Sequence, residues 1–179
     1  MKRFRQYFSR RWRFCPGDAL LAFLFLLSLG LIIWGIDIYR LTVIEAKFLI
    51  AATTVGAFIP VVVIFLLQTR RLYTVWTFFI SIAIGAGFFF FALLYLNRTL
   101  GEKETLTEEF VIIRSGSLAR GKYGSCRRPY VIINFYGVEK QLLFYCEYEK
   151  TVKGFSKVMV TYSRGLFGFD VIASKQLIK

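Results

Sequence analysis

The stretch ALLAFLFLLSLGLIIWGI, residues 19–36, decides the fold class of this chain. It contains no Asp, Glu, Lys or Arg, and twelve of its residues are Leu, Ile or Phe. A helix needs about 20 apolar residues to cross the hydrocarbon core of a bilayer. Each Leu, Ile or Phe near the helix centre favours insertion by roughly 0.3–0.6 kcal/mol. The stretch is therefore predicted to be a transmembrane helix.

Two further uncharged runs follow, at residues 48–67 and 75–96. Three buried helices of this kind would need a larger soluble body around them than the rest of a 179-residue chain offers. Residues 18–97 are therefore predicted to form a three-helix transmembrane domain. The second and third helices should pack as an antiparallel pair, because the connection between them is short.

Basic residues near the helix ends predict the orientation, because cytoplasmic loops carry an excess of Lys and Arg. One side carries eight of them: Lys2, Arg3, Arg5, Arg10, Arg11, Arg13, Arg70 and Arg71. The other side carries four: Arg40, Lys47, Arg98 and Lys103. The N-terminus is therefore expected in the cytoplasm, and an odd number of spans then places the C-terminal domain outside the cytoplasmic membrane.

Residues 1–17 form a basic cytoplasmic segment with aromatic residues at nearly helical spacing: Phe4, Tyr7, Phe8 and Trp12. One interpretation is an interfacial helix on the anionic inner leaflet. The alternative is a positively charged tail without regular structure. The apolar run that follows is longer than that of a usual signal peptide and no small-residue cleavage site follows it, so the anchor is expected to be retained.

The third predicted helix contains small residues at helix-packing spacing: Ser81, Ala83, Gly85 and Gly87. Such pairs let helix backbones approach closely in lipid. Packing within the chain is the favoured interpretation, and dimerisation is the alternative. None of the three apolar runs contains an ionisable side chain, whereas pumps, selective channels and voltage sensors depend on such groups. A transporter formed by this chain alone is not expected.

After residue 97 the long uncharged runs end, and a polar segment and then alternating apolar and polar residues follow. Residues 98–108 are predicted to be a polar, acidic linker, and Asn97-Arg98-Thr99 at its start matches a glycosylation sequon. Alternating apolar and polar residues then predict five strands, at residues 110–114, 129–135, 141–148, 157–162 and 169–173. The sequence thus predicts an α+β membrane protein, with three transmembrane helices followed by a small antiparallel β domain, residues 109–179, that forms an open barrel or sandwich.

Two of the three cysteines, Cys126 and Cys146, flank the strongest predicted hairpin. If its turn centres on Tyr136, they face each other, at a Cα separation of about 4.5–5.5 Å that a disulfide accepts. A domain outside the cell would also lie in an oxidising compartment. Two reduced cysteines are the alternative. Cys15 is expected to be free at the cytoplasmic edge.

The chain lacks the residues of most catalytic and metal sites. It has no His, no phosphate-binding glycine loop and no C-x-x-C pair. Its acidic cluster falls in or beside the predicted linker, where a solvated spacer is expected: Glu102, Glu104, Glu108 and Glu109. No enzymatic activity, cofactor or metal is therefore predicted.

Four basic residues gather around one loop of the β domain: Arg120, Lys122, Arg127 and Arg128. They could contact anionic lipid head groups or an acidic partner, and a solvated loop is the alternative. The net charge is +13, and topology explains much of it. Nucleic acid is not expected as a partner of a domain outside the cell.

The segment GFSKVMVTYSRGLFG carries a weak family resemblance through six residues: Gly154, Val158, Val160, Tyr162, Gly165 and Gly168. It resembles a segment of small bacterial membrane proteins of uncharacterised function that carry an extracytoplasmic β domain. The usual members resemble two-span proteins, whereas three spans are predicted here. The resemblance implies a location and a domain type, and no catalytic residue.

These observations predict a non-enzymatic membrane protein whose partners are the lipid bilayer and one or more proteins. The β domain would present a binding surface, as an accessory subunit of an envelope assembly or as a protective, immunity-type protein. A sensor of small ligands, or a transport accessory protein, is the alternative. It would need a pocket in the β domain or a cavity between the helices.

Overall fold

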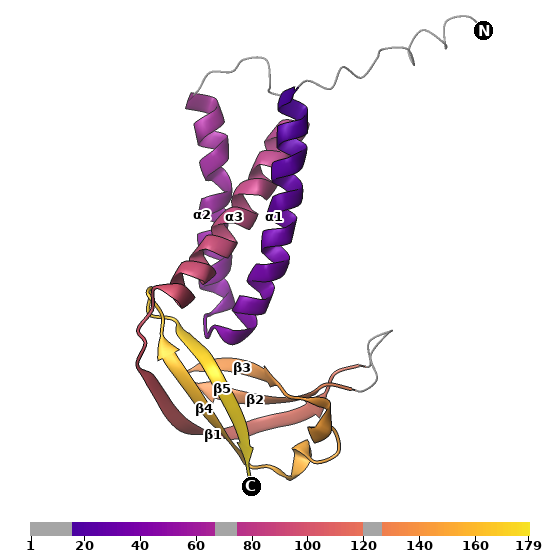
Figure 1. Ribbon diagram of the computed structural model, residues 1–179, viewed down its shortest axis with the longest axis vertical. Coiled ribbons are helices and arrows are strands. Elements are labelled where there is room, and N and C mark those ends of the chain that lie inside the picture. Colours follow the sequence, from indigo (N-terminus) through magenta and orange to yellow (C-terminus); the bar gives the residue numbers. More distant parts are fainter. Residues whose placement is uncertain (1–15, 67–74, 120–126) are drawn as a thin grey trace, which may run out of the picture.

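A computed structural model describes residues 16–66, 75–119 and 127–179 of the chain. Three long helices stand side by side, and a curled five-stranded sheet lies at one end of them (Figure 1). The helices are α1 (Pro16–Leu41), α2 (Ala46–Leu66) and α3 (Val75–Thr99). Each is long and apolar enough to cross a membrane. The predicted α+β class, three candidate spans followed by a β domain, is therefore confirmed.

Helix α3 packs against both α1 and α2, and glycines allow the close approach. A Cβ on Gly56 of α2 would overlap the Phe89 side chain, and one on Gly35 of α1 would lie 2.6 Å from the Phe90 ring. In the absence of a hydrophobic force between helices in lipid, such close packing is a main source of their association.

Helix α1 is longer than the predicted span and continues to Leu41. At about 1.5 Å per residue its 26 residues extend about 39 Å, more than the roughly 30 Å of a hydrocarbon core. Its last turns carry Asp37 and Arg40, which form an exposed ion pair at 3.3 Å. Helix α1 is therefore longer than a hydrocarbon core is thick, and its last turns lie at the end that faces the β domain (Figure 1).

The β domain is an antiparallel sheet with the strand order β3-β2-β1-β4-β5. Its strands are β1 (Thr105–Ser117), β2 (Pro129–Phe135), β3 (Val138–Leu143), β4 (Lys157–Arg164) and β5 (Asp170–Ile178). Two short 3₁₀ helices, η1 (Cys146–Tyr148) and η2 (Val152–Gly154), connect β3 to β4.

The long strand β1 makes the sheet curl. Its first part, residues 105–111, pairs with β4, and its second part, residues 112–117, pairs with β2. The register shifts between Ile112 and Arg114, and such a bulge bends a strand and increases its twist. The sheet becomes a half-barrel whose two edges, β3 and β5, do not pair with each other in the part of the chain that the structure describes. We call the gap between these edges the seam.

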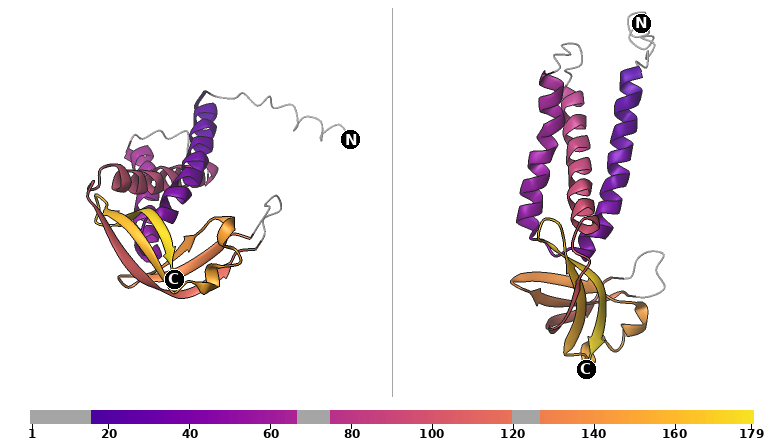
Figure 2. Two further views of the ribbon diagram at one scale, coloured as in Figure 1. Left: turned by 60° about the horizontal axis from the view of Figure 1, so that its bottom comes forward. Right: turned by 60° about the vertical axis from the view of Figure 1, so that its left-hand side comes forward.

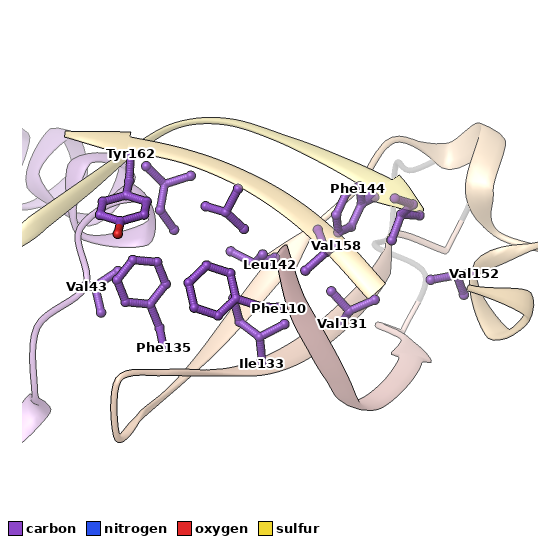
Figure 3. Packing of buried hydrophobic residues seen from close by; sticks show 13 residues of the cluster. Val43, Phe110, Val131, Ile133, Phe135, Leu142, Phe144, Val152, Val158 and Tyr162 are labelled. Atoms are coloured by element: carbon purple, nitrogen blue, oxygen red, sulfur yellow. The ribbon is translucent and has the colours of Figure 1, made fainter. Parts of the chain in front are cut away.

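The inner face of the half-barrel holds the larger apolar core. Phe110, Phe135 and Tyr162 are its large aromatic members near Val43, and the Phe110 and Phe135 rings are stacked at 4.7 Å between centroids (Figure 3). Val43 joins this core, although it comes from the loop between α1 and α2. The core is therefore completed by a residue from the helical part of the chain.

Several predicted strand boundaries are wrong: β1 covers Thr105–Ser117 instead of residues 110–114, β3 begins at Val138 instead of residue 141, and β5 continues to Ile178 instead of ending at residue 173. The strand predicted at residues 141–148 ends at Leu143, because its partner β2 begins at Pro129, which has no N–H to extend the ladder. The predicted linker is also shorter, because β1 begins at Thr105. Glu108 and Glu109 lie in β1, where the Glu109 carboxylate forms a salt bridge with the Lys157 ammonium of β4 at 2.9 Å.

The helix packing predicts opposite results for two glycines. Gly56→Ala should lower the free energy of unfolding by about 1–3 kcal/mol, because the added methyl overlaps Phe89. Gly30→Ala in α1 should have little effect, because nothing lies within 4 Å of the added methyl. Unfolding of both variants in detergent measures the difference. Equal stability of the two variants would contradict the packing described here.

Candidate functional site

The loop between α1 and α2 fills the upper part of the seam. Thr42 forms an antiparallel bridge with Val171 of β5, and the Val43 N–H donates to the Asp170 carbonyl at 2.8 Å. Thr42 is completely buried, and Val43 packs near Phe135 (Figure 3). The loop thus satisfies part of the free edge of β5, which would otherwise expose backbone donors and acceptors.

Lys140 reaches the same loop from the opposite edge, β3. Its ammonium group donates to the Tyr39 carbonyl at 3.0 Å and to the Thr42 carbonyl at 2.5 Å, and it lies 4.9 Å from the centroid of the Tyr39 ring. These carbonyls stand at the C-terminal end of α1, where a cation is favoured by the helix dipole. Burial, and to a lesser degree the charge of Lys175, lowers the pKa of Lys140 to about 8.

Asn97, in the last turns of α3, holds the turn between β4 and β5. Its amide nitrogen donates to the Phe169 carbonyl at 3.0 Å, and its amide oxygen accepts from the Phe167 N–H at 3.0 Å. The Asn97 carbonyl also accepts from the Leu166 N–H at 3.1 Å. Gly165 is required beside it, because a Cβ there would overlap the amide. Asn97 is fully buried, so the sequon at this position is not available to a glycan.

An apolar contact completes this connection. The Phe169 ring lies 5.0 Å from the Phe48 ring of α2 and packs against a buried cluster from α1, α2, α3 and the α1–α2 loop. We call the contacts of Thr42, Asn97, Lys140 and Phe169 the joint. Through the joint the β domain is packed onto the ends of the helices, opposite to the start of α1 (Figure 2).

The joint predicts that Asn97→Ala destabilises the chain by about 1–3 kcal/mol, because it leaves the Phe167 N–H without its partner and removes one of the two hydrogen bonds that the Phe169 carbonyl accepts, the other being from the Gly165 N–H. Trypsin should also cleave faster at Arg98 and Lys103 in the connection to β1. Thr99→Ala is the matched control, since its exposed hydroxyl bonds only within α3. Unfolding and proteolysis in detergent test both effects, and identical behaviour of the two variants would exclude the role of Asn97.

Below the joint, the seam continues as an open groove of about 720 Å³. Its walls come from the end of β3 with η1 on one side, and from β5 on the other. The lining residues are Leu41, Arg128, Leu143, Phe144, Tyr145, Cys146, Tyr148, Ala173, Ser174, Lys175, Gln176 and Leu177. This volume lies in the range of roughly 300–1,000 Å³ that is usual for ligand sites.

The groove carries positive charge and no acidic side chain among the residues that line it. Arg128 is exposed at its rim. The Lys175 ammonium lies 5.4 Å from the centroid of the Phe144 ring, and burial lowers the pKa of Lys175. The groove is therefore suited to a ligand that combines apolar groups with negative charge.

A smaller hollow of about 310 Å³ lies where β1 and β4 approach the helices, lined by Glu102, Glu104, Leu106, Tyr162, Arg164, Gly168 and Asp170. Next to it, the Glu108 carboxylate accepts hydrogen bonds from Tyr136 and Tyr162. The pKa of Tyr162 is raised first by burial, then by its hydrogen bond with the Tyr136 hydroxyl at 3.2 Å and then by its hydrogen bond with Glu108. Burial also raises the pKa of Asp170. Within the described residues, no group of three or more metal-ligating side chains occurs.

The structure describes one of the two cysteines that are predicted to pair. Cys146 is disulfide-bonded and lies in η1, while Cys126 lies outside the described residues. The geometric argument for their pairing is wrong in its register, because Tyr130 pairs with Leu143 and the turn centres between Tyr136 and Gly137. The observed ladder is shifted by one residue from the predicted one. The bond between Cys126 and Cys146 stays a prediction, as does the free state of Cys15, which also lies outside the described residues.

The small residues of α3 pack inside the chain. Gly85 lies against Pro60 of α2, and Gly87 lies against Ser28 and Ile32 of α1. The Ser28 hydroxyl donates to the Ala83 carbonyl at 3.2 Å. Ser81 is buried and donates to the Thr77 carbonyl at 2.7 Å. The small residues of α3 thus pack against both neighbouring helices, α1 and α2.

The predicted basic loop is described only in part. Arg127 and Arg128 are exposed, and Arg128 reaches the rim of the groove. Arg120 and Lys122 lie outside the described residues, so their position relative to the groove stays a prediction.

Sequence reasoning missed the residues of the joint. Asn97 is recognised in the sequence only as part of a sequon, and Lys140 falls between two predicted strands, at residues 129–135 and 141–148. The sequence offers one signal for Asn97, a polar amide directly after an uninterrupted apolar helix. No pattern signals Lys140, because its partners lie about a hundred residues earlier in the chain.

Comparisons of the chain with protein-family models, with curated proteins and with solved structures give no match. The resemblance of residues 154–168 to small bacterial membrane proteins therefore stays an expectation. In the structure, two of its three glycines lie at the joint and in the turn after β4: Gly165 contacts Asn97, and Gly168 has a positive φ of 80°. The third, Gly154, ends η2.

Proposed function

We propose that this chain is a non-enzymatic membrane protein that presents its β domain for protein interaction at the outer face of the cytoplasmic membrane. It would act as an accessory or assembly subunit of an envelope complex, or as an immunity-type protective protein. The observation that carries the proposal is the joint, which mounts the β domain on the helix ends instead of leaving it on a flexible tether.

A β domain that is held in one orientation is better suited to recognising a partner than a domain on a flexible linker. Holding a domain in one orientation removes part of the entropy that a partner in the same membrane would otherwise lose on binding. Leu41, at the end of α1, lines the groove, so this surface begins close to the end of a candidate span. A partner that is itself attached to the membrane could reach it.

The charge pattern and the disulfide support the proposed orientation. The β domain lies at the opposite end of the helices from the start of α1, which follows the basic N-terminal segment (Figure 1). Basic segments favour the cytoplasmic side. Cys146 is disulfide-bonded, and disulfides persist mainly in oxidising compartments outside the cytoplasm.

Thiol labelling tests this orientation. A reagent that does not cross membranes, applied to intact cells after mild reduction, should modify Cys126 and Cys146 and spare Cys15, because only the first two would lie outside. Cys15 should react after the cells are permeabilised, which controls for its reactivity. Labelling of Cys15 alone in intact cells would reverse the proposed orientation.

Cross-linking followed by purification tests the interaction. A membrane-impermeant, amine-reactive cross-linker should join the β domain, through exposed lysines such as Lys150, Lys153 or Lys157, to a protein recovered in stoichiometric amount from mild detergent. An unrelated three-span protein at the same expression level is the control. Recovery of a lone monomer, or the same proteins in the control, would contradict the proposed function.

A further inference from the structure

The outer edge of β5 remains open along the groove. β5 is the last strand of the sheet, and β4 is its one partner strand among the described residues, over residues 170–178 with a register shift at Ala173. The α1–α2 loop covers this edge at Asp170 and Val171, but Ala173, Ser174 and Gln176 are exposed. Within the described part of the chain, no other backbone segment forms a bridge with this edge. An open strand edge carries N–H and C=O groups that another extended chain can pair with.

The chain itself shows that this edge accepts an extended segment. Thr42 and Val43 pair with it in antiparallel fashion, and the Val43 side chain enters the core of the half-barrel. The groove begins directly beyond, because Leu41 forms part of its wall. A second extended segment could therefore continue along the edge from the point where the loop leaves it.

The chemistry of the walls defines such a segment. Leu143, Phe144 and Leu177 offer apolar contacts. Tyr145, which is 82% exposed, adds aromatic surface. Arg128 and Lys175 supply two positive charges, and none of the described residues that line the groove carries a carboxylate. Neither of these basic residues forms an ion pair with a described acidic residue. An incoming segment that alternates acidic and apolar side chains would satisfy both the charges and the apolar surface.

We propose that the groove binds an extended, acidic segment of a partner protein, which adds to the free edge of β5 as a further strand. This inference rests on the proposed function and names the partner's chemistry. Backbone hydrogen bonds would supply affinity, and the alternating side chains would supply selectivity, as in other cases of strand addition. The segment would place its acidic side chains beside Arg128 and Lys175.

Three labelled peptides test the proposal on the full chain in an uncharged detergent: a heptapeptide that alternates Glu and Val, one that alternates Lys and Val, and the first with Pro at its central position. Fluorescence anisotropy should show at least about tenfold tighter binding of the Glu peptide than of either other peptide, about 1.4 kcal/mol. Its binding should slow hydrogen exchange of those backbone amides of residues 173–177 that face the groove and are not already bonded to β4.

Charge reversal in the protein provides the matched comparison. Arg128→Glu and Lys175→Glu should each weaken binding of the Glu peptide about tenfold or more. Lys153→Glu, at an exposed position of η2, should leave the affinity unchanged. Arg128 is exposed, so its variant should fold even if the half-buried Lys175 variant does not.

Several results would overturn the proposal. They are the absence of saturable binding of the Glu peptide up to about 1 mM, equal binding of the Lys or Pro peptide, and protection of amides other than those of residues 173–177. Protection of these amides without peptide, rising with protein concentration, would assign the groove to a second copy instead. If cross-linking captures a partner while the peptides fail, the proposed function stands and only the groove is wrongly assigned.

Discussion

The structure depends on how the seam of the half-barrel is closed. A small curled sheet that does not close into a barrel leaves two edges with unpaired backbone groups and a core open to water. Here Thr42 and Val43, from the loop between two candidate transmembrane helices, pair with one edge, and Lys140 from the other edge binds the same loop. The β domain can therefore complete its core only where the helices end.

The joint contains buried polar groups, and burying such groups is costly unless they are hydrogen-bonded. A buried amide without partners costs about 1–3 kcal/mol, yet Asn97 is fully buried because two backbone groups of the β4–β5 turn satisfy it. Lys140 is buried against the end of α1. Burial outweighs the favourable carbonyls and lowers its pKa to about 8, but the ammonium form still predominates at neutral pH. Both contacts depend on the helices and the sheet being in place together.

This interdependence links architecture to the proposed role. A domain that is packed on the helix ends by backbone pairing, a buried amide and an inserted Phe169 presents a defined face relative to the bilayer. The loop between α1 and α2 closes the upper part of the seam. Below it, the seam remains open as a basic, partly apolar groove. A single structural feature, the incomplete closure of the sheet, thus accounts for both the joint and the proposed binding surface.

Much of the fold was predictable from local patterns. Uncharged runs such as residues 19–36 demand lipid as their solvent, and the alternation in strands such as β4 requires one buried and one wetter face, so helix number and domain class follow from the sequence alone. The bounds of β2 were predicted correctly, at Pro129 and Phe135. The residues of the joint were not, because their roles come from partners far away in the chain.

The sequence by itself determined that three apolar helices precede a small antiparallel β domain, because hydrophobic length and periodicity are local properties. Only the tertiary structure decided that Thr42, Asn97 and Lys140 join the two parts, and that a groove remains beside β5. These features arise from contacts between segments that lie some 70 to 130 positions apart, and no local pattern of residues encodes such contacts.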